Sequence, residues 1–236
     1  MAVAANGAQS PDRGVDALVI SGAARPDTLA FARRRHPDAL VIAADGGLAA
    51  AVAIGLPVDM VVGDLDSVDA QQLADAEAHG ALVETHPREK DATDLELAVR
   101  KAMARRATSV VVVDSTAGRL DHFLGGVILL ASGLLVGLEV TAYIDDAMVV
   151  VVRGGGTRAV PAPIGALVTL LPTHGAAVGV TTEGLQYPLT RETLVAGTTR
   201  GVSNVVIGPD PRVSVTAGAL LVIVPDAITR DEGADR

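Results

Sequence analysis

Residues 39–67 read ALVIAADGGLAAAVAIGLPVDMVVGDLDS and contain two short apolar runs that each end in glycine and aspartate. The first run leads into Asp45-Gly46-Gly47, and the second leads into Gly63-Asp64-Leu65-Asp66-Ser67. Such short aliphatic runs are typical of strands buried in a parallel sheet. This stretch therefore predicts two strands with polar side chains just beyond their carboxyl ends.

The same alternation extends to both sides of this stretch. Further short apolar runs lie at residues 17–20, 110–113 and 140–144, and helix candidates lie at 28–35, 71–79 and 94–106. In the last of these, apolar residues recur at the spacing of one helical face, namely Leu95, Ala98, Val99, Ala102 and Met103. Strands that alternate with helices predict an α/β domain with a mostly parallel sheet over residues 17–146.

The sequence changes character at about residue 147. Residues 153–236 hold 7 of the 12 prolines and no lysine. Short Val-rich and Thr-rich runs alternate there with Gly and Pro turns, at residues 166–171, 178–182, 205–207, 213–216 and 220–224. Closely spaced short strands of this kind predict an all-β sandwich as a C-terminal domain over residues 147–228. We expect residues 1–16 to form a flexible tail and residues 229–236 a charged one.

Composition excludes several classes of protein. The chain has 236 residues, of which 49% are hydrophobic and 20% charged, so it has the composition of a globular protein and not of a disordered one. It has no cysteine, which excludes disulfides, thiolate metal sites and cysteine nucleophiles and suits a cytoplasmic location. Its net charge of -9 opposes binding to phosphate backbones, so no nucleic acid partner is expected.

No membrane partner is expected either. The longest stretch without a charged residue or a histidine, residues 123–138, is shorter than the roughly 20 residues that a membrane-spanning helix needs. We interpret it as a buried helix followed by a loop. Aromatic residues make up only 2% of the chain, which leaves few rings for stacking on a flat ligand.

Carboxylates follow three of the predicted strands. They are Asp45, the pair Asp64 and Asp66, and Asp114. In an open α/β sheet the carboxyl ends of the strands face the ligand-binding crevice. Carboxylates gathered there repel one another, and Mg²⁺ is a cation that such oxygen ligands hold. Aspartate is also common in turns after strands, and for Asp114 alone that explanation stays open.

The segment Lys90-Asp91-Ala92-Thr93-Asp94-Leu95-Glu96 carries two signals. Thr93 and Glu96 have the spacing of a capping box, which predicts the start of a helix. This interpretation leaves Lys90, Asp91 and Asp94 unexplained. A helix N-terminus beside a lysine is a natural phosphate site, and the adjacent acids suit the metal that accompanies a phosphate.

The segment Gly118-Arg119-Leu120-Asp121-His122 opens the apolar stretch that follows residues 110–113. Arg119 is suited to neutralising charge on a transferring phosphoryl group. The alternative is that Arg119, Asp121 and His122 only cap a helix and form surface pairs. The chain has no G-x-x-x-x-G-K-[ST] loop and no G-x-G-x-x-G fingerprint after the first predicted strand.

Together these segments resemble a known family. The segments at 45–47, 63–67, 90–96 and 118–122, in this order and spacing, resemble the catalytic domain of thiamine pyrophosphokinases, also called thiamine diphosphokinases. Residues 182–189, TEGLQYPL, and 201–204, GVSN, are similar to the thiamine-binding β domain of that family. The resemblance extends from about residue 17 to 225.

This resemblance implies a cytoplasmic homodimer that requires Mg²⁺ and transfers a pyrophosphoryl group from ATP to the hydroxyl of thiamine, releasing AMP. Its site would lie between the domains and across the subunit interface. By matching positions, Asp64, Asp66 and Asp94 would bind the metal. The further catalytic candidates are Asp91, close to the metal, with Arg119 and Asp121. The substrate-binding candidates are Asp45, Gly46, Gly47, Ser67, Lys90, Thr93, His122, Tyr187, Ser203 and Asn204, with Tyr187 as the one aromatic residue expected near the thiamine pocket.

Three residues depart from the family pattern. Leu65 stands where the family usually has Phe, Gly126 where several members have Asn, and Val205 where several have an acidic residue. Two other functions stay open. One is a thiamine-binding or nucleotide-binding protein of the same fold without turnover, and the other is a Mg²⁺-dependent nucleotide hydrolase or a pyrophosphokinase acting on another alcohol.

Overall fold

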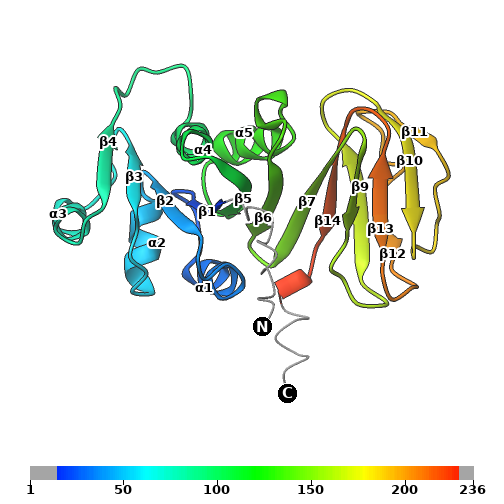
Figure 1. Cartoon of the computed structure of the whole chain (residues 1–236), viewed down its shortest axis with the longest axis horizontal. Helices are drawn as coiled ribbons and strands as arrows, with labels where there is room; N and C mark the ends of the chain where they lie inside the picture. Colours follow the sequence, from blue (N-terminus) through cyan, green and yellow to red (C-terminus); the bar gives the residue numbers. More distant parts are fainter. Residues whose placement is uncertain (1–14, 229–236) are drawn as a thin grey trace, which may run out of the picture.

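The computed structural model describes residues 15–228, so most of the predicted N-terminal tail and all of the charged C-terminal tail lie outside the described residues. The described chain forms a ten-stranded sheet in the order β12-β9-β14-β7-β6-β5-β1-β2-β3-β4 and a four-stranded sheet in the order β11-β10-β13-β8 (Figure 1). The strands are β1 (Val15–Ile20), β2 (Leu40–Ala44), β3 (Met60–Gly63), β4 (Leu82–Thr85), β5 (Ala107–Asp114), β6 (Glu139–Ile144), β7 (Ala147–Arg153), β8 (Gly156–Ala159), β9 (Leu167–Pro172), β10 (Ala177–Glu183), β11 (Glu192–Leu194), β12 (Asn204–Val205), β13 (Arg212–Val215) and β14 (Ala219–Val224). The helices are α1 (Pro26–Arg35), α2 (Gly47–Ala53), α3 (Ala70–Ala78), α4 (Asp94–Ala104), α5 (Leu120–Leu130) and the short 3₁₀ helix η1 (Gly133–Leu135).

The half of the large sheet from β6 to β4 is parallel, as predicted. Strand β1 pairs with β2 on one side and with β5 on the other. The chain moves outward from β1 to β4 and then returns through α4 to β5 on the opposite side of β1. The connection after β1 leads to β2 on one side of this strand pair, and the connection after β5 leads to β6 on the other side. Connections that diverge in this way open a crevice at the carboxyl ends of the two strands.

Helices cover both faces of the parallel half. Leu18 and Ile20 of β1 belong to a core cluster with α1 and α2, whereas Ala17 and Val19 belong to a second cluster with α4 and α5. Figure 1 shows these two helix pairs on opposite sides of the sheet. The predicted strands of this half and the helices α1, α3 and α4 are confirmed. Helix α2 and the four-residue strand β4 were not predicted.

The large sheet continues beyond the parallel half without a break. After β6 the chain turns at Asp145-Asp146 into β7, which pairs antiparallel with β6, and β14, β9 and β12 add antiparallel strands. The four-stranded sheet packs on this extension, and a single apolar cluster runs from Leu29 of α1 to Val213 of β13. The predicted mostly parallel α/β part and antiparallel β part are confirmed. The predicted boundary at residues 146 and 147 lies at the turn between two paired strands, and the division into domains stays a prediction.

Helix α5 differs from the expected buried helix. Gly126, Leu129 and Leu130 are buried, but Leu120, Leu124 and Ile128 are 69%, 49% and 55% exposed. These three residues follow one another at a spacing of four, so they form one apolar stripe on the solvent face of the helix. The prediction failed because α5 is apolar on both faces and only one of them meets the sheet. Within residues 15–228, no helix has the length and apolar character needed to cross a bilayer.

Candidate active site

A cavity of about 400 Å³ lies at the carboxyl ends of β1, β2 and β5. The residues that follow these strands form one side of it, and the N-terminal residues of α4 and α5 form the other. Its lining residues are Ser21, Gly22, Ala23, Ala44, Asp45, Thr93, Asp94, Leu95, Asp114, Ser115, Ala117, Gly118, Arg119, His122 and Phe123. The crevice expected from the strand order is therefore lined by three of the segments that the sequence singled out.

Tight backbone turns place the acidic residues after β2 and β3. Asp45 and Leu65 have φ values of +46° and +62°, a region that side chains other than glycine rarely adopt. A Cβ atom on Gly47 would lie 2.3 Å from the carbonyl oxygen of Ile20. Only glycine therefore allows α2 to start this close to the end of β1, which explains the glycine that follows Asp45-Gly46.

Three carboxylates come together at the end of the sheet. One oxygen from each of Asp45, Asp64 and Asp66 lies within 4.8 Å of the others. Asp45 Oδ2 accepts a hydrogen bond from Ser67 Oγ, whereas Asp45 Oδ1 is buried and has no hydrogen-bond partner. A buried carboxylate oxygen without a donor, beside two further carboxylates, fits a hard divalent cation such as Mg²⁺.

Asp94 lies outside this group of three, although the resemblance implied it as a metal ligand. Asp94 Oδ1 lies 2.9 Å from Lys90 Nζ, and Lys90 Nζ lies 3.4 Å from Asp64 Oδ2. Partial burial lowers the pKa of Lys90, but the hydrogen bonds and charges of Asp94 and Asp64 more than offset this effect and raise its pKa. The backbone N–H of Asp66 and then Lys90 lower the pKa of Asp64. Lys90 therefore links the loop after β3 to the start of α4.

The start of α4 confirms half of the predicted capping box. Thr93 Oγ1 accepts a hydrogen bond of 3.2 Å from the backbone N–H of Glu96. The carboxylate of Glu96 instead pairs with Arg100 at 2.6 Å. Asp91 is exposed and belongs neither to the cavity lining nor to the group of three carboxylates. Its catalytic role stays a prediction.

Arg119 and Asp121 form a bidentate pair at the start of α5. Arg119 Nε and Nη2 donate to the two oxygens of Asp121 at 3.1 and 2.6 Å. The hydrogen bond from Arg119 lowers the pKa of Asp121 to about 2. Arg119 and His122 line the cavity, and Asp121 does not. The pair is exposed to solvent, so Arg119 can exchange this partner for an anionic ligand at little cost.

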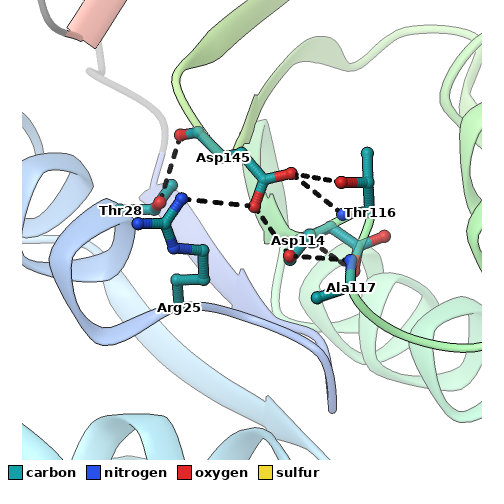
Figure 2. A network of polar contacts seen from close by, with 7 residues as sticks. Arg25, Thr28, Asp114, Thr116, Ala117 and Asp145 are labelled. Atoms are coloured by element: carbon teal, nitrogen blue, oxygen red, sulfur yellow. Dashed lines mark hydrogen bonds and ion pairs between the residues drawn. The ribbon is translucent and has the colours of Figure 1, made fainter.

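Asp145 fixes the loop that leads to Arg119, a role that no sequence pattern predicted. Its Oδ1 accepts a 2.6 Å hydrogen bond from Ser115 Oγ, and its Oδ2 accepts from the backbone N–H and hydroxyl of Thr116 at 3.1 and 2.6 Å. Arg25 lies 3.7 Å from Oδ1, and the Thr28 hydroxyl donates to the carbonyl oxygen of Asp145 (Figure 2). Partial burial raises the pKa of Asp145, but these donors outweigh it and lower the pKa overall.

Two of the three candidates in the β domain, Tyr187 and Asn204, border a second, smaller cavity of about 180 Å³, and Ser203 does not line it. Tyr187, Asn204, Glu192 and Arg200 are among its lining residues. The buried amide of Asn204 donates to the carbonyl of Tyr187 at 2.8 Å and accepts from the backbone N–H of Tyr187 at 3.0 Å. Asn204 therefore holds the backbone that presents Tyr187. Ser203 is exposed at a φ of +61°, and the substrate-binding roles of these three residues stay predictions.

The two cavities share no lining residue. Asn204 lies on β12 and Asp114 on β5, five steps apart in the large sheet. At about 4.8 Å per step, this separation is about 24 Å along the sheet. Within one chain, the predicted thiamine residues therefore do not meet the acidic group.

Comparison with known proteins identifies the family. Residues 33–141 match the model of the thiamin pyrophosphokinase catalytic domain, and residues 160–220 match the model of the thiamin pyrophosphokinase vitamin B1 binding domain. The chain belongs to the thiamin pyrophosphokinase family. These two matches also support the predicted enzyme class, a thiamine diphosphokinase.

Individual relatives of the thiamin pyrophosphokinase family agree with this assignment. The thiamine pyrophosphokinase of Bacillus subtilis is 26% identical over 168 residues, which are 71% of this chain and 78% of the relative. A crystal structure of thiamin pyrophosphokinase from Geobacillus thermodenitrificans has a TM-score of 0.73 at 25% identity and covers 89% of this chain and 97% of its own. The crystal structure of the Bacillus subtilis protein has a TM-score of 0.74 at 24% identity, with 89% and 98% covered.

The structure explains one departure from the thiamin pyrophosphokinase pattern. A Cβ atom at Gly126 would lie 3.1 Å from Leu95 Cδ2 and 3.4 Å from Asp114 Oδ2. A larger side chain at this position would therefore require Leu95 to shift, whereas glycine leaves Leu95 in place. Leu65 contacts the small apolar cluster around Leu48 and Val61. Nothing in the structure explains why Val205 replaces an acidic residue.

The expectation that Tyr187 is the one aromatic residue near the thiamine pocket stays a prediction, and a second ring lies at the main cavity. Phe123, on the second turn of α5, lines the main cavity of this thiamin pyrophosphokinase family member. The other two rings, Phe31 and Tyr143, pack edge to face in the core with centroids 5.3 Å apart. Because the stretch from residue 123 was predicted to be helical, Phe123 could have been placed on the same helix as His122. The sequence does not tell which face of that helix meets the cavity.

Asp145→Ala is expected to lower the diphosphokinase kcat/KM about 10- to 100-fold, since the loop before Arg119 loses three hydrogen bonds and the arginine is displaced. Asp145→Asn should recover most of this loss, because asparagine keeps one acceptor oxygen and tolerates the φ of +50° at this position. The matched control is Asp146→Ala in the same turn. Steady-state kinetics that find Asp145→Ala and Asp146→Ala equally active would contradict the positioning role.

Proposed function

We propose that this chain is a cytoplasmic enzyme that transfers a pyrophosphoryl group from ATP to the hydroxyl of thiamine, giving thiamine diphosphate and AMP. The observation that carries the proposal is the cavity at the ends of β1, β2 and β5. Asp45, Asp94 and Arg119 line it beside the N-termini of two helices. Asp45 belongs to the group of three carboxylates, and Lys90 bridges Asp94 to Asp64 of that group. Alternating cationic and anionic groups of this kind suit a triphosphate that carries a divalent cation.

Asp45, Asp64 and Asp66 would hold Mg²⁺. One oxygen from each of these three residues lies within 4.8 Å of the others, a grouping that does not include Asp94, and Asp45 contributes a buried oxygen without a hydrogen-bond partner. When bound, the ion neutralises negative charge on the phosphate oxygens. Lys90 limits the repulsion among the acids and positions Asp94 at the start of α4.

The transfer joins the thiamine hydroxyl oxygen to the β-phosphorus of ATP and breaks the bond between that phosphorus and the oxygen that bridges it to the α-phosphate. Positioning and charge neutralisation supply most of the catalysis in such reactions. Arg119 would leave Asp121 and bind the transferring group. His122 lines the cavity and is the better acceptor of the hydroxyl proton, because a carboxyl whose pKa is about 2, as in Asp121, is a weak base near neutral pH.

An assay of AMP release tests this function. With ATP, Mg²⁺ and thiamine, the purified chain should release one AMP for each thiamine diphosphate formed. Release of AMP without thiamine would favour the hydrolase, and faster release with another alcohol than with thiamine would favour a different pyrophosphokinase. Thiamine binding in a calorimeter without any AMP would favour the non-catalytic binding protein.

Tyr187→Ala is expected to raise the KM for thiamine roughly three- to tenfold and to leave the KM for ATP unchanged. The ring of Tyr187 is 61% exposed at the second cavity, where it is free to stack on a flat cationic ligand. Tyr187→Phe keeps the ring and should behave like the wild type. An unchanged KM for thiamine in Tyr187→Ala would remove this residue from the site.

We propose further that the enzyme acts as a homodimer. The apolar stripe of Leu120, Leu124 and Ile128 offers a surface next to Arg119 that a second copy can cover. A second copy would also explain how the thiamine residues reach a cavity that lies far from them within one chain. Both features support an interface that includes α5.

Leu124→Asp is expected to shift the chain from dimer to monomer in sedimentation velocity, since it puts a charge in the middle of the stripe. Leu82→Asp is the matched control, because Leu82 is similarly exposed but lies on the edge strand β4, away from α5. A wild type that sediments as a monomer, or a Leu124→Asp variant that remains dimeric, would contradict this interface.

A further inference from the structure

Asp114 is a buried carboxylate that the proposed transfer does not use. It is the last residue of β5, is only 7% exposed and lines the main cavity. Its neighbour across the sheet is Ser21, which follows the end of β1 and lines the same cavity. A carboxylate that is more than nine-tenths buried in a cavity wall needs hydrogen-bond donors on both oxygens.

Only one oxygen of Asp114 has such donors. Asp114 Oδ1 accepts hydrogen bonds from Ser21 Oγ and, at 2.9 Å, from the backbone N–H of Ser115. No donor within residues 15–228 bonds to Oδ2. Burial raises the pKa of Asp114, the two hydrogen bonds offset part of this effect, and the charge of Asp145 adds to it. Oδ2 is thus an acceptor left for a ligand in the cavity.

The space beside Oδ2 is kept open and apolar. On α5, Gly126 lies beside this oxygen, and an added Cβ there would lie 3.4 Å from Oδ2. Leu95 and Phe123 form apolar walls of the same cavity. The other charge that acts on Asp114 is the carboxylate of Asp145, which is also negative. An anionic phosphate would be repelled here, whereas a neutral ring system with a hydrogen-bond donor would fit.

We propose that Asp114 Oδ2 accepts a hydrogen bond from the nucleoside part of the bound nucleotide and so selects which nucleotide enters the cavity. The ligand group is a neutral donor, either a ribose hydroxyl or the exocyclic amine of the base. This inference rests on the proposed function, because it takes the cavity to hold ATP. It makes Asp114 a specificity-determining residue, with Ser21 and Ser115 fixing its orientation.

Equilibrium binding in the absence of thiamine tests the inference on the full chain. We would measure Kd by calorimetry with Mg²⁺ and each of ATP, 2′-deoxy-ATP, 3′-deoxy-ATP and inosine triphosphate. The wild type should bind ATP at least about tenfold more tightly than the one analogue that lacks the selected donor. A deoxy analogue that binds weakly identifies the ribose hydroxyl, and weak binding of inosine triphosphate identifies the amine.

Asp114→Asn is the decisive variant, because it keeps an oxygen for Ser21 and Ser115 and replaces the free acceptor with an N–H donor. It should weaken ATP binding about tenfold and remove the preference for ATP over the affected analogue. Asp38→Asn is the control, since Asp38 is exposed before β2 and lies outside the lining of the main cavity, and this variant should keep the preference. A wild type that binds all four nucleotides equally, or an Asp114→Asn variant with unchanged affinity ratios, would overturn the inference.

These outcomes separate the inference from the proposed function. If the wild type forms thiamine diphosphate and AMP but Asp114→Asn keeps the wild-type ratios, only the inference fails. If the wild type binds ATP with selectivity that depends on Asp114 but forms no thiamine diphosphate, only the proposed function fails.

Discussion

Asp64→Asn and Asp66→Asn are each expected to lower turnover by about 10²- to 10³-fold, the range found when one electrostatic contact to a transition state is lost. Both remove a carboxylate from the group of three that lies within 4.8 Å. The unfolding temperature of Asp66→Asn should stay unchanged or rise slightly. Asp66 is exposed, and its removal relieves repulsion among like charges in the metal-free protein. Activity assays over a range of Mg²⁺ concentrations, together with thermal unfolding, measure both effects.

Asp38→Asn provides the matched control for this experiment. Asp38 is an exposed aspartate that precedes β2, whereas Asp45 follows it, so the two lie at opposite ends of the same strand. Its substitution should leave activity unchanged. If Asp64→Asn or Asp66→Asn turns over at the wild-type rate under limiting Mg²⁺, the carboxylate group does not hold the metal.

Arg119→Ala is expected to lower kcat/KM by at least about 10³-fold, because no other described cation lining the cavity can neutralise the transferring group. Arg119→Lys should recover only part of the activity, since a lysine lacks the planar fork of the guanidinium. Stability should not change, because the side chains of Arg119 and Asp121 are mostly exposed to solvent. The pKa of Asp121, about 2 beside Arg119, should rise toward its ordinary value in Arg119→Ala, and NMR titration can follow this change.

Arg158→Ala is the corresponding control. Arg158 lies on β8 and pairs with Glu139 at 3.6 Å, away from the cavity lining. An Arg119→Ala variant that keeps most of its activity, while Asp121 still titrates near pH 2, would contradict the role given to this arginine.

Local sequence pattern predicted the parallel half of the fold well. Aliphatic runs that end in glycine and aspartate, as at 40–47 and 60–66, define both a strand and the point where it stops. The continuation into β7, β14 and β9 could not be predicted in this way. The run at 147–153 has the pattern of a buried strand, but which strand it pairs with depends on the turn at Asp145, and no local periodicity encodes that choice.

In the site, too, local patterns were predictable and contacts between distant residues were not. The meeting of Asp45, Asp64 and Asp66 was predictable, because neighbouring parallel strands end at the same edge of a sheet. The contribution of Asp145 was not, since its hydrogen bonds to Ser115 and Thr116 join residues about 30 positions apart. The exposed stripe of α5 was missed for a related reason, because an apolar residue signals burial only when a partner surface lies within the same chain.

The fate of the β-phosphorus of ATP tests the central claim most directly. In an incubation of the wild type with Mg²⁺, thiamine and ATP labelled at the β-phosphorus, the label should appear in thiamine diphosphate, with unlabelled AMP as the other product. Label that stays in ADP would mean that a single phosphoryl group is transferred, and label released as free pyrophosphate would mean hydrolysis. Either result would contradict pyrophosphoryl transfer to thiamine at this site.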